Sequence, residues 1–134
     1  MDKDEQNLLR TQAVMMILRN WGLSSDQKLQ ILAMTDAIRS RHLTKYEHDT
    51  AFPDEPDIQE RIDHILGIAD ALRTMYPTYP KMGDQWMHQN NRFFKTETPM
   101  ECILNNDLAG LLRVRRHIDC AYDWSLDDKK NQSP

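Results

Sequence analysis

Apolar residues between Pro56 and Pro77 recur every three or four positions, and this feature constrains the fold more than any other. The recurring residues are Ile58, Ile62, Ile65, Leu66, Ala69 and Leu72. This spacing places them on one face of an α-helix. Prolines at 77 and 80 disfavour helix in the residue before each of them. We therefore predict a long helix over residues 57–75.

Two local signals refine this long helix. Residues 57–60, Asp-Ile-Gln-Glu, have the pattern of a capping box, in which side chains at the first and fourth positions satisfy free backbone N–H groups. Gly67 lowers helix propensity in the middle of the segment. We interpret it as the point where another helix crosses closely.

The first 45 residues predict three further helices. The first ends at Gly22. The second begins with a capping-box pattern at residues 24–27, and the third covers about residues 37–45 after a cap at 35–36. The apolar face predicted for the first helix consists of Leu8, Leu9, Ala13, Met16, Ile17 and Trp21. This order is that of a helix-turn-helix, but any small helical bundle can produce it, so both interpretations stay open.

The second half of the chain continues the helical pattern. Residues 46–56 are predicted to be a linker because they combine two prolines and four acids with few apolar residues. A short helix follows at 82–89, and Thr98-Pro99 starts another that ends near Asn105. A last helix begins at Asn105 or Asn106 and carries Leu108, Leu111, Leu112, Ile118 and Ala121 on its apolar side. The end, from Ser125, is expected to fray. No segment predicts a strand, so the expected fold class is all-α.

Composition excludes several classes of protein. The chain has 134 residues, of which 40% are hydrophobic and 28% charged, and its net charge of −4 gives no general attraction to nucleic acid. It lacks an apolar run long enough for a membrane span, and its acidic N-terminus does not resemble a signal peptide. We therefore expect a cytoplasmic protein. Cys102 and Cys120 are expected to be buried thiols rather than a disulfide.

Catalytic and metal sites find little support. His117 and Cys120 are three residues apart on one predicted helix, a spacing that metal ligands can use. A zinc site needs three or four ligands, and no second pair of Cys or His has comparable spacing. Nucleophilic catalysis needs Ser or Cys beside a positioned base, but both cysteines are predicted to lie on apolar faces as core residues. No glycine-rich loop is present to hold phosphate. We expect no enzyme activity, no metal and no cofactor.

The least ordinary stretch is WMHQNNRFFKTETP, residues 86–99, between two predicted helices. Its two asparagines suit a turn. Trp86 and one of Phe93 and Phe94 can form a local aromatic plug. Alternatively, part of the cluster presents an aromatic surface to a partner.

This stretch and its neighbours resemble the toxin-binding domain of Xre/MbcA/ParS-type antitoxins. The shared pattern is W-M-x-x-x-N-x-x-F, then T-P-M-E-C-I-L, then L-L-x-V-x-x-x-I-D. The helix preceding this pattern is also similar, from Arg61 to Leu72. The resemblance covers residues 8–123 and is most specific from residue 57 onward.

The resemblance implies an antitoxin that blocks the active site of a RES-type, NAD-consuming toxin without catalysis of its own. It implies two regions, a helix-turn-helix-like domain at 1–50 and a toxin-binding domain at 57–134 that includes the long connecting helix 57–75. The residues expected to bind the toxin are Trp86, Asn91, Phe94, Arg113, Arg116 and Trp124. For the arginines of the last helix, ion pairs with Asp119 and Asp123 are the competing interpretation.

The resemblance also implies that the N-terminal region binds operator DNA and represses the chain's own operon. The residues expected to contact DNA are Arg39, Ser40, Arg41, His42 and Lys45. The sequence departs from the family at Ala33, where the turn commonly has Gly, at Asp36, whose charge repels phosphate, and at His42, where Trp is common. A solvated helix surface is therefore an equal interpretation of this basic face.

The expected partners are thus a RES-domain toxin and operator DNA, in a homodimer or a hetero-oligomer with the toxin. The alternative is a stand-alone helix-turn-helix regulator whose C-terminal half serves only for dimerisation.

Overall fold

The computed structural model describes residues 2–34 and 40–131, and helices are the only regular elements among them. The chain divides into two compact units, unit 1 (Met1–Leu66) and unit 2 (Gly67–Pro134). The predicted all-α fold class is confirmed for the described part of the chain. None of the helices found there is both long enough and apolar enough to cross a membrane.

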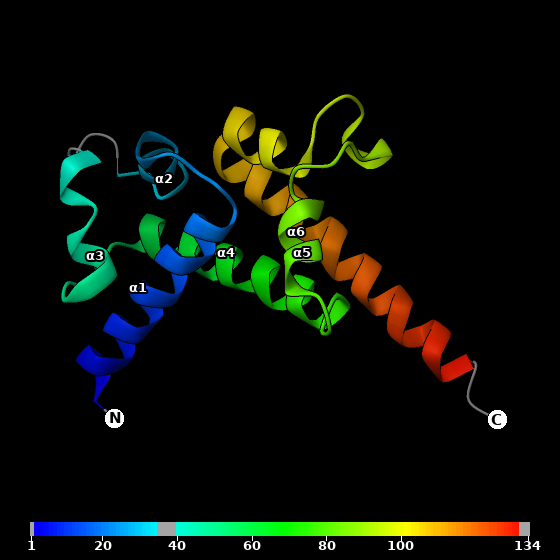
Figure 1. Ribbon diagram of the computed structural model, residues 1–134, viewed down its shortest axis with the longest axis horizontal. Coiled ribbons are helices and arrows are strands. Elements are labelled where there is room, and N and C mark those ends of the chain that lie inside the picture. Colours follow the sequence, from blue (N-terminus) through cyan, green and yellow to red (C-terminus); the bar gives the residue numbers. More distant parts are fainter. Residues whose placement is uncertain (1, 35–39, 132–134) are drawn as a thin grey trace. The chain divides into compact units, whose positions relative to one another are not determined.

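Unit 1 begins with α1 (Lys3–Asn20) and α2 (Ser25–Ile31), which appear in blue in Figure 1. The predicted capping box of α2 is confirmed: Gln27 N donates to Ser24 Oγ at 3.2 Å, and Ser24 N donates to Gln27 Oε1 at 2.9 Å. Gly22 ends α1 with a φ of +74°. Because a left-handed residue is what a helix needs after its last turn, this glycine is the stop that the sequence predicts.

The buried face of α1 differs from the predicted one. The buried residues are Thr11, Val14, Met15 and Leu18, followed by Trp21 just after the helix. Leu9 and Met16 are instead 51% and 63% exposed. Apolar residues occur on both sides of α1, so their spacing alone does not select the face that packs against the core.

The third helix predicted in unit 1 does not run continuously to Lys45. Residues 40–48 form a 3₁₀ turn, η1 (Ser40–His42), and the four-residue helix α3 (Lys45–His48). Tyr46 N donates to the carbonyl of Leu43, an i→i+3 bond of 3.0 Å. Both Leu43 and Tyr46 are buried. A tightened chain aligns residues three apart on one side, and burial of this pair favours it over a regular helix.

Residues 46–56 pack within unit 1. They are therefore not the linker that we predict from composition. The Phe52 ring is buried, with its centroid 5.0 Å from that of Tyr46. Phe52 N donates to Thr11 Oγ1 at 2.9 Å, and Gln12 Nε2 donates to the His48 carbonyl at 2.7 Å. Two aromatic side chains thus hold a segment that is otherwise polar.

The long helix α4 (Pro56–Met75) begins one residue before the predicted range and ends at its predicted last residue. Its predicted capping box is wrong. Pro56 occupies the first helical position, which its fixed φ suits, so Asp57 lies inside the first turn. Asp57 instead accepts a 3.2 Å bond from Nε of Arg61, whose guanidinium is buried and also donates to the Ile31 carbonyl at 3.4 Å.

Unit 2 contains the end of α4, then α5 (Pro80–Trp86), the 3₁₀ turn η2 (Arg92–Phe94) and α6 (Pro99–Asn131). The short helix α5 lies earlier than the predicted 82–89, since Pro80 starts it. The described core of unit 2 consists of Ile68, Ala71, Leu72, Met87, Phe94, Met100, Cys102, Ile103, Leu111, Val114 and Ile118.

A sharp break at Asp107 divides α6 into the two helices that the sequence predicts (Figure 1). Asp107 has φ 54° and ψ −136°, outside the helical region. A Cβ on Gly110 would collide with the Cys102 carbonyl oxygen and lie 2.8 Å from Ile103 Cα. The break therefore folds the second part of α6 tightly onto the first, which only glycine at position 110 permits. The helix extends past Ser125 to Asn131.

Gly67 marks a close approach, as predicted, but a side chain rather than a helix backbone occupies the space. A Cβ at this position would lie 2.6 Å from Nε and Cζ of Arg115 on α6. The Arg115 side chain thus lies across α4 at its one glycine, with Nε 3.7 Å from an Asp119 carboxylate oxygen.

Candidate partner-binding site

His117 on α6 is the centre of an aromatic cluster in unit 2. Its ring stacks on that of Phe93, with 4.1 Å between centroids and 19° between planes. The Trp86 ring is nearly parallel to it at 6.3 Å, and Phe94 meets it edge-on at 5.3 Å. Phe93 and Phe94 also contact each other edge to face, at 5.0 Å. These are the geometries that aromatic rings prefer.

Arg113 completes the cluster from one helical turn earlier on α6. Its guanidinium carbon lies 5.4 Å from the Phe93 centroid and 5.5 Å from the Phe94 centroid. One of its terminal nitrogens donates to the Phe93 carbonyl at 3.1 Å. A guanidinium over aromatic rings gains a cation–π attraction in addition to the hydrogen bond. Arg113 therefore fixes both the backbone and the rings of η2. We name Trp86, Phe93, Phe94, Arg113 and His117 the His117 cluster.

Short-range interactions give the segment between α5 and α6 its shape. Asn91 Oδ1 accepts from Phe93 N at 2.9 Å and so caps η2. Lys95 ends η2 with φ 61° and ψ −112°, a conformation that favours glycine. The predicted capping box at the start of α6 is confirmed, with Glu101 N donating to Thr98 Oγ1 at 3.1 Å and Thr98 N donating to Glu101 Oε1 at 3.3 Å. The ends of the segment are thus fixed on both sides of the rings.

Burial changes the titration of two groups near these rings. It lowers the pKa of His117, because its ring is partly removed from water and the charged form loses hydration. Burial also raises the pKa of the Cys102 thiol, and the charge of Arg113 offsets part of that rise. The site therefore holds a neutral imidazole and a protonated thiol at neutral pH, which gives Cys102 little nucleophilic character.

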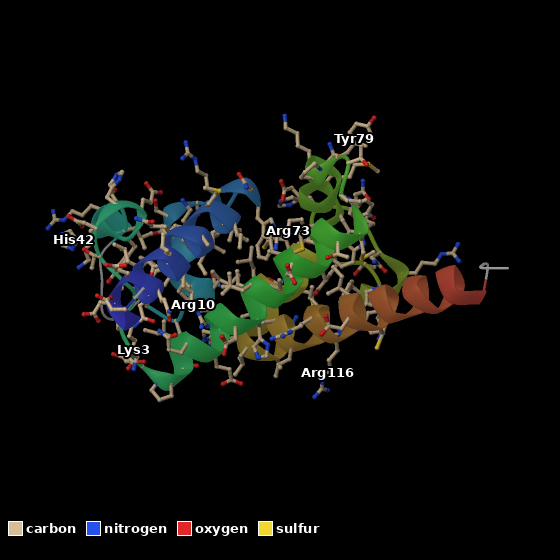
Figure 2. All side chains as sticks on the ribbon, turned by 90° about the horizontal axis from the view of Figure 1, so that it is seen from below. Lys3, Arg10, His42, Arg73, Tyr79 and Arg116 are labelled. Carbon is tan, nitrogen blue, oxygen red and sulfur yellow. The ribbon has the colours of Figure 1, made fainter. Side chains whose placement is uncertain are left out.

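The residues predicted to bind a toxin lie in different surroundings. Trp86 and Asn91 are half-buried, and Phe94 is buried at 2% exposure. Arg113 and Arg116 are exposed, and the Arg116 side chain points away from α6 in Figure 2. Trp124 belongs to the α6 backbone, but its side chain lies outside what the structure describes. Trp86, Phe94 and Arg113 are brought together by the fold, and Asn91 supports them.

The residues predicted to contact DNA all belong to unit 1. Arg39 lies outside the described residues, and Ser40 is the first residue of η1. Arg41, His42 and Lys45 are exposed, and Figure 2 shows His42 at the edge of its unit. Arg41 Nε donates to His42 Nε2 at 3.3 Å, and Lys45 Nζ lies 5.2 Å from the Tyr46 centroid. Three basic or titratable side chains thus reach solvent over two successive turns.

Sequence reasoning missed the central role of His117, which it weighed only as a metal ligand. The missed signal is the four-residue separation of Arg113 and His117, which puts both on one helix face. No group of three His, Cys, Asp or Glu side chains in the described part of the chain could hold a metal ion. The prediction of a buried thiol is right for Cys102 and wrong for Cys120, which is exposed. Cys120 is two residues past buried Ile118 and so lies on a different side of the helix.

Comparisons with known proteins give one relative. The uncharacterized protein y4oB of Sinorhizobium fredii (strain NBRC 101917 / NGR234) is 29% identical over 108 residues, which cover 81% of this chain and 80% of that protein. No family model matches the chain. No solved structure matches it significantly. The chain is thus similar, over most of its length, to a protein whose name carries no function.

Proposed function

We propose that this chain is the antitoxin of a type II toxin–antitoxin system and that it binds and blocks the active site of a RES-type, NAD-consuming toxin. The observation that carries the proposal is the His117 cluster. Trp86 and Phe94 belong to the first segment of the family-like pattern and Arg113 lies within the last, and the three side chains meet around one ring. Two of the three segments that carry the resemblance thus contribute to one compact cluster in unit 2, and this supports the proposal.

The inhibitory role requires a stable surface and no chemistry. The cluster offers aromatic area beside guanidinium groups, the residue types that dominate tight protein interfaces. Inhibition then follows from occupancy: one antitoxin covers one toxin entrance and keeps out the dinucleotide. Neutralisation is therefore stoichiometric and rises with the amount of antitoxin.

We further propose that unit 1 binds operator DNA, so that the antitoxin represses its own operon. Exposed Arg41 and Lys45 support this role, since arginine reads guanine and both residues hold phosphate. The same side chains would serve the alternative function, a stand-alone regulator. Binding of a toxin distinguishes an antitoxin from a stand-alone regulator.

Co-expression tests the proposal. The chain is co-expressed with a RES-domain reading frame found beside its gene, and growth, cellular NAD and co-purification are followed. We expect rescued growth, maintained NAD and a stable complex. A toxin that still kills, with no complex recovered at excess antitoxin, would exclude the proposal, and DNA binding by gel shift in that case would favour the stand-alone regulator.

A further inference from the structure

Phe93 is the one exposed ring of the His117 cluster, whose other rings are half-buried or buried. It keeps 48% of its surface exposed, whereas its neighbour Phe94 is 2% exposed. Among the side chains of unit 2 that the structure describes, Tyr79 at 67% and Met82 at 47% are also strongly exposed large apolar residues. Neither takes part in the ring contacts around His117. Phe93 therefore differs from them in being exposed and held in place at once.

Three contacts hold the Phe93 ring. His117 stacks on it at 4.1 Å, Phe94 meets it edge to face at 5.0 Å, and the Arg113 guanidinium lies 5.4 Å from its centroid. The Phe93 backbone is fixed as well, by Asn91 on its N–H and Arg113 on its carbonyl. A side chain ordered in advance loses little conformational entropy when a partner covers it. This is the property of an interface anchor.

Positive charge surrounds the ring. Arg92 and Lys95 lie on either side of Phe93 in the sequence and are both exposed, and the exposed Arg113 holds its guanidinium 5.4 Å from the Phe93 centroid. The chain as a whole has a net charge of −4, so this basic segment is a local departure. The nearby acid, Glu97, is half-buried. Charge complementarity then favours a partner surface that is negative around an apolar centre.

We propose that Phe93 is the anchor by which this chain docks on its toxin, filling an apolar pocket whose rim carries carboxylates. The inference rests on the proposed function and adds to it the residue and the chemistry of the partner surface. A protein partner is the one to expect here, because the proposed function gives unit 2 a toxin to bind and assigns DNA to unit 1. The proposal thus assigns the anchor to η2 and not to the part of α6 beyond Asp119.

The test measures affinity for a purified RES-domain toxin, the partner sought in the co-expression experiment, with the full chain as titrant. Phe93→Ala is expected to weaken binding by about 30-fold or more, the loss typical of an anchor residue. Tyr79→Ala is the matched control, since it removes an exposed ring from the same unit, and it is expected to change affinity by less than about threefold. Arg92→Glu with Lys95→Glu is expected to slow association and to weaken its dependence on salt.

Each outcome decides the inference. If the unchanged chain binds the toxin and Phe93→Ala binds within about threefold of it, the anchor is overturned while the proposed function stands. If the unchanged chain does not bind, the proposed function fails and takes the anchor with it.

If Phe93→Ala is unfolded by circular dichroism, Phe93→Leu replaces it and is expected to show a smaller loss in the same direction; unchanged binding by Phe93→Leu would then overturn the anchor. Tight binding of a labelled single-stranded oligonucleotide that depends on Phe93, without toxin binding, would assign the surface to nucleic acid instead.

Discussion

At the scale of single residues, His117 links packing to pH. Its folded-state pKa lies below the ordinary value of 6.5 because its ring is partly buried. Between the folded and unfolded pKa values, the unfolded chain binds more protons. The stabilising contribution of the neutral ring is therefore complete above about pH 6.5 and is lost as the pH falls toward the folded value.

We expect the free energy of unfolding to fall between pH 7.5 and 5.5 and part of that slope to vanish in His117→Gln. Urea unfolding at four pH values, followed by circular dichroism, measures both profiles. The difference between the two profiles isolates His117 from the other titrating groups. Parallel profiles for the two proteins would show that the ring is not sufficiently desolvated to affect stability.

Ala33 carries a second residue-scale consequence. It has a φ of 59°, and its N–H bonds the Gln30 carbonyl while Met34 N bonds that of Leu29. The end of α1 uses the same bonding pattern with Gly22 in the left-handed position. The chain therefore closes two helices in the same way, once with glycine and once with a residue that resists this conformation.

Ala33→Gly is expected to raise the free energy of unfolding by about 0.5–1 kcal/mol. This is the energy that a residue with a Cβ loses in the left-handed conformation, minus the extra conformational entropy that glycine loses on folding. Gly22→Ala is the reciprocal change. Nothing lies within 4 Å of a Cβ there, so its expected loss reports backbone strain alone. Urea midpoints of both variants test the pair, and a loss of stability in Ala33→Gly would contradict the assignment.

At the scale of elements, α1 has two apolar faces with different roles. Leu18 is fully buried and Met16, two residues away, is 63% exposed. We expect Leu18→Ala to lower the free energy of unfolding by about 2–5 kcal/mol and Met16→Ala by no more than about 0.5 kcal/mol. Chemical unfolding distinguishes them, and equal losses would mean that Met16 is covered in solution.

Gly67 and Gly110 leave the least space for a Cβ among the described glycines of unit 2, but they are expected to differ in how well they tolerate alanine. A Cβ at Gly110 meets the backbone of Cys102 and Ile103, which cannot move without reshaping the break in α6. A Cβ at Gly67 meets only the end of the Arg115 side chain, which can rotate away. We expect Gly110→Ala to cost at least about 2 kcal/mol and Gly67→Ala to stay within about 1 kcal/mol of the unchanged protein, since alanine also favours helix. Thermal unfolding of both variants measures this, and a tolerated Gly110→Ala would refute the close packing.

Two of the three predicted capping boxes are confirmed because their signals are local, whereas Pro56 takes the first position of α4 and displaces the third. Ser24 with Gln27 and Thr98 with Glu101 form the capping boxes that their spacing predicts. The buried face of α1 was not predictable, because tertiary packing chose between two apolar sides. The 3₁₀ geometry around Leu43 and the burial of Phe52 in a polar segment likewise depend on partners distant in the sequence. In the His117 cluster, the aromatic pattern of the sequence predicts Trp86 and Phe94. It does not predict His117, the ring that contacts both of them.

At the scale of the whole molecule, the two proposed activities belong to different compact units. The basic side chains of Arg41 and Lys45 lie in unit 1, and the His117 cluster lies in unit 2. We expect Arg41→Ala with Lys45→Ala to weaken operator binding at least about tenfold, through lost phosphate and base contacts, and to leave toxin neutralisation intact. Gel shift and growth rescue on the same variant measure the two activities, with Lys3→Ala with Lys28→Ala as a charge-matched control in unit 1. Loss of rescue in the basic-face variant alone would show that the activities are not separable.

The parallel rings of Trp86 and His117 also equip the protein with an optical signal. An imidazolium in contact with an indole quenches its fluorescence more strongly than a neutral imidazole does, so the emission of Trp86 follows the protonation of its neighbour. Trp21 and Trp124 are the other tryptophans in the chain, and replacing both by Phe leaves a single indole, with its ring centroid 6.3 Å from that of the histidine. A fluorescence titration of that protein would read the state of the cluster directly, in the free chain and in a complex, without any attached label.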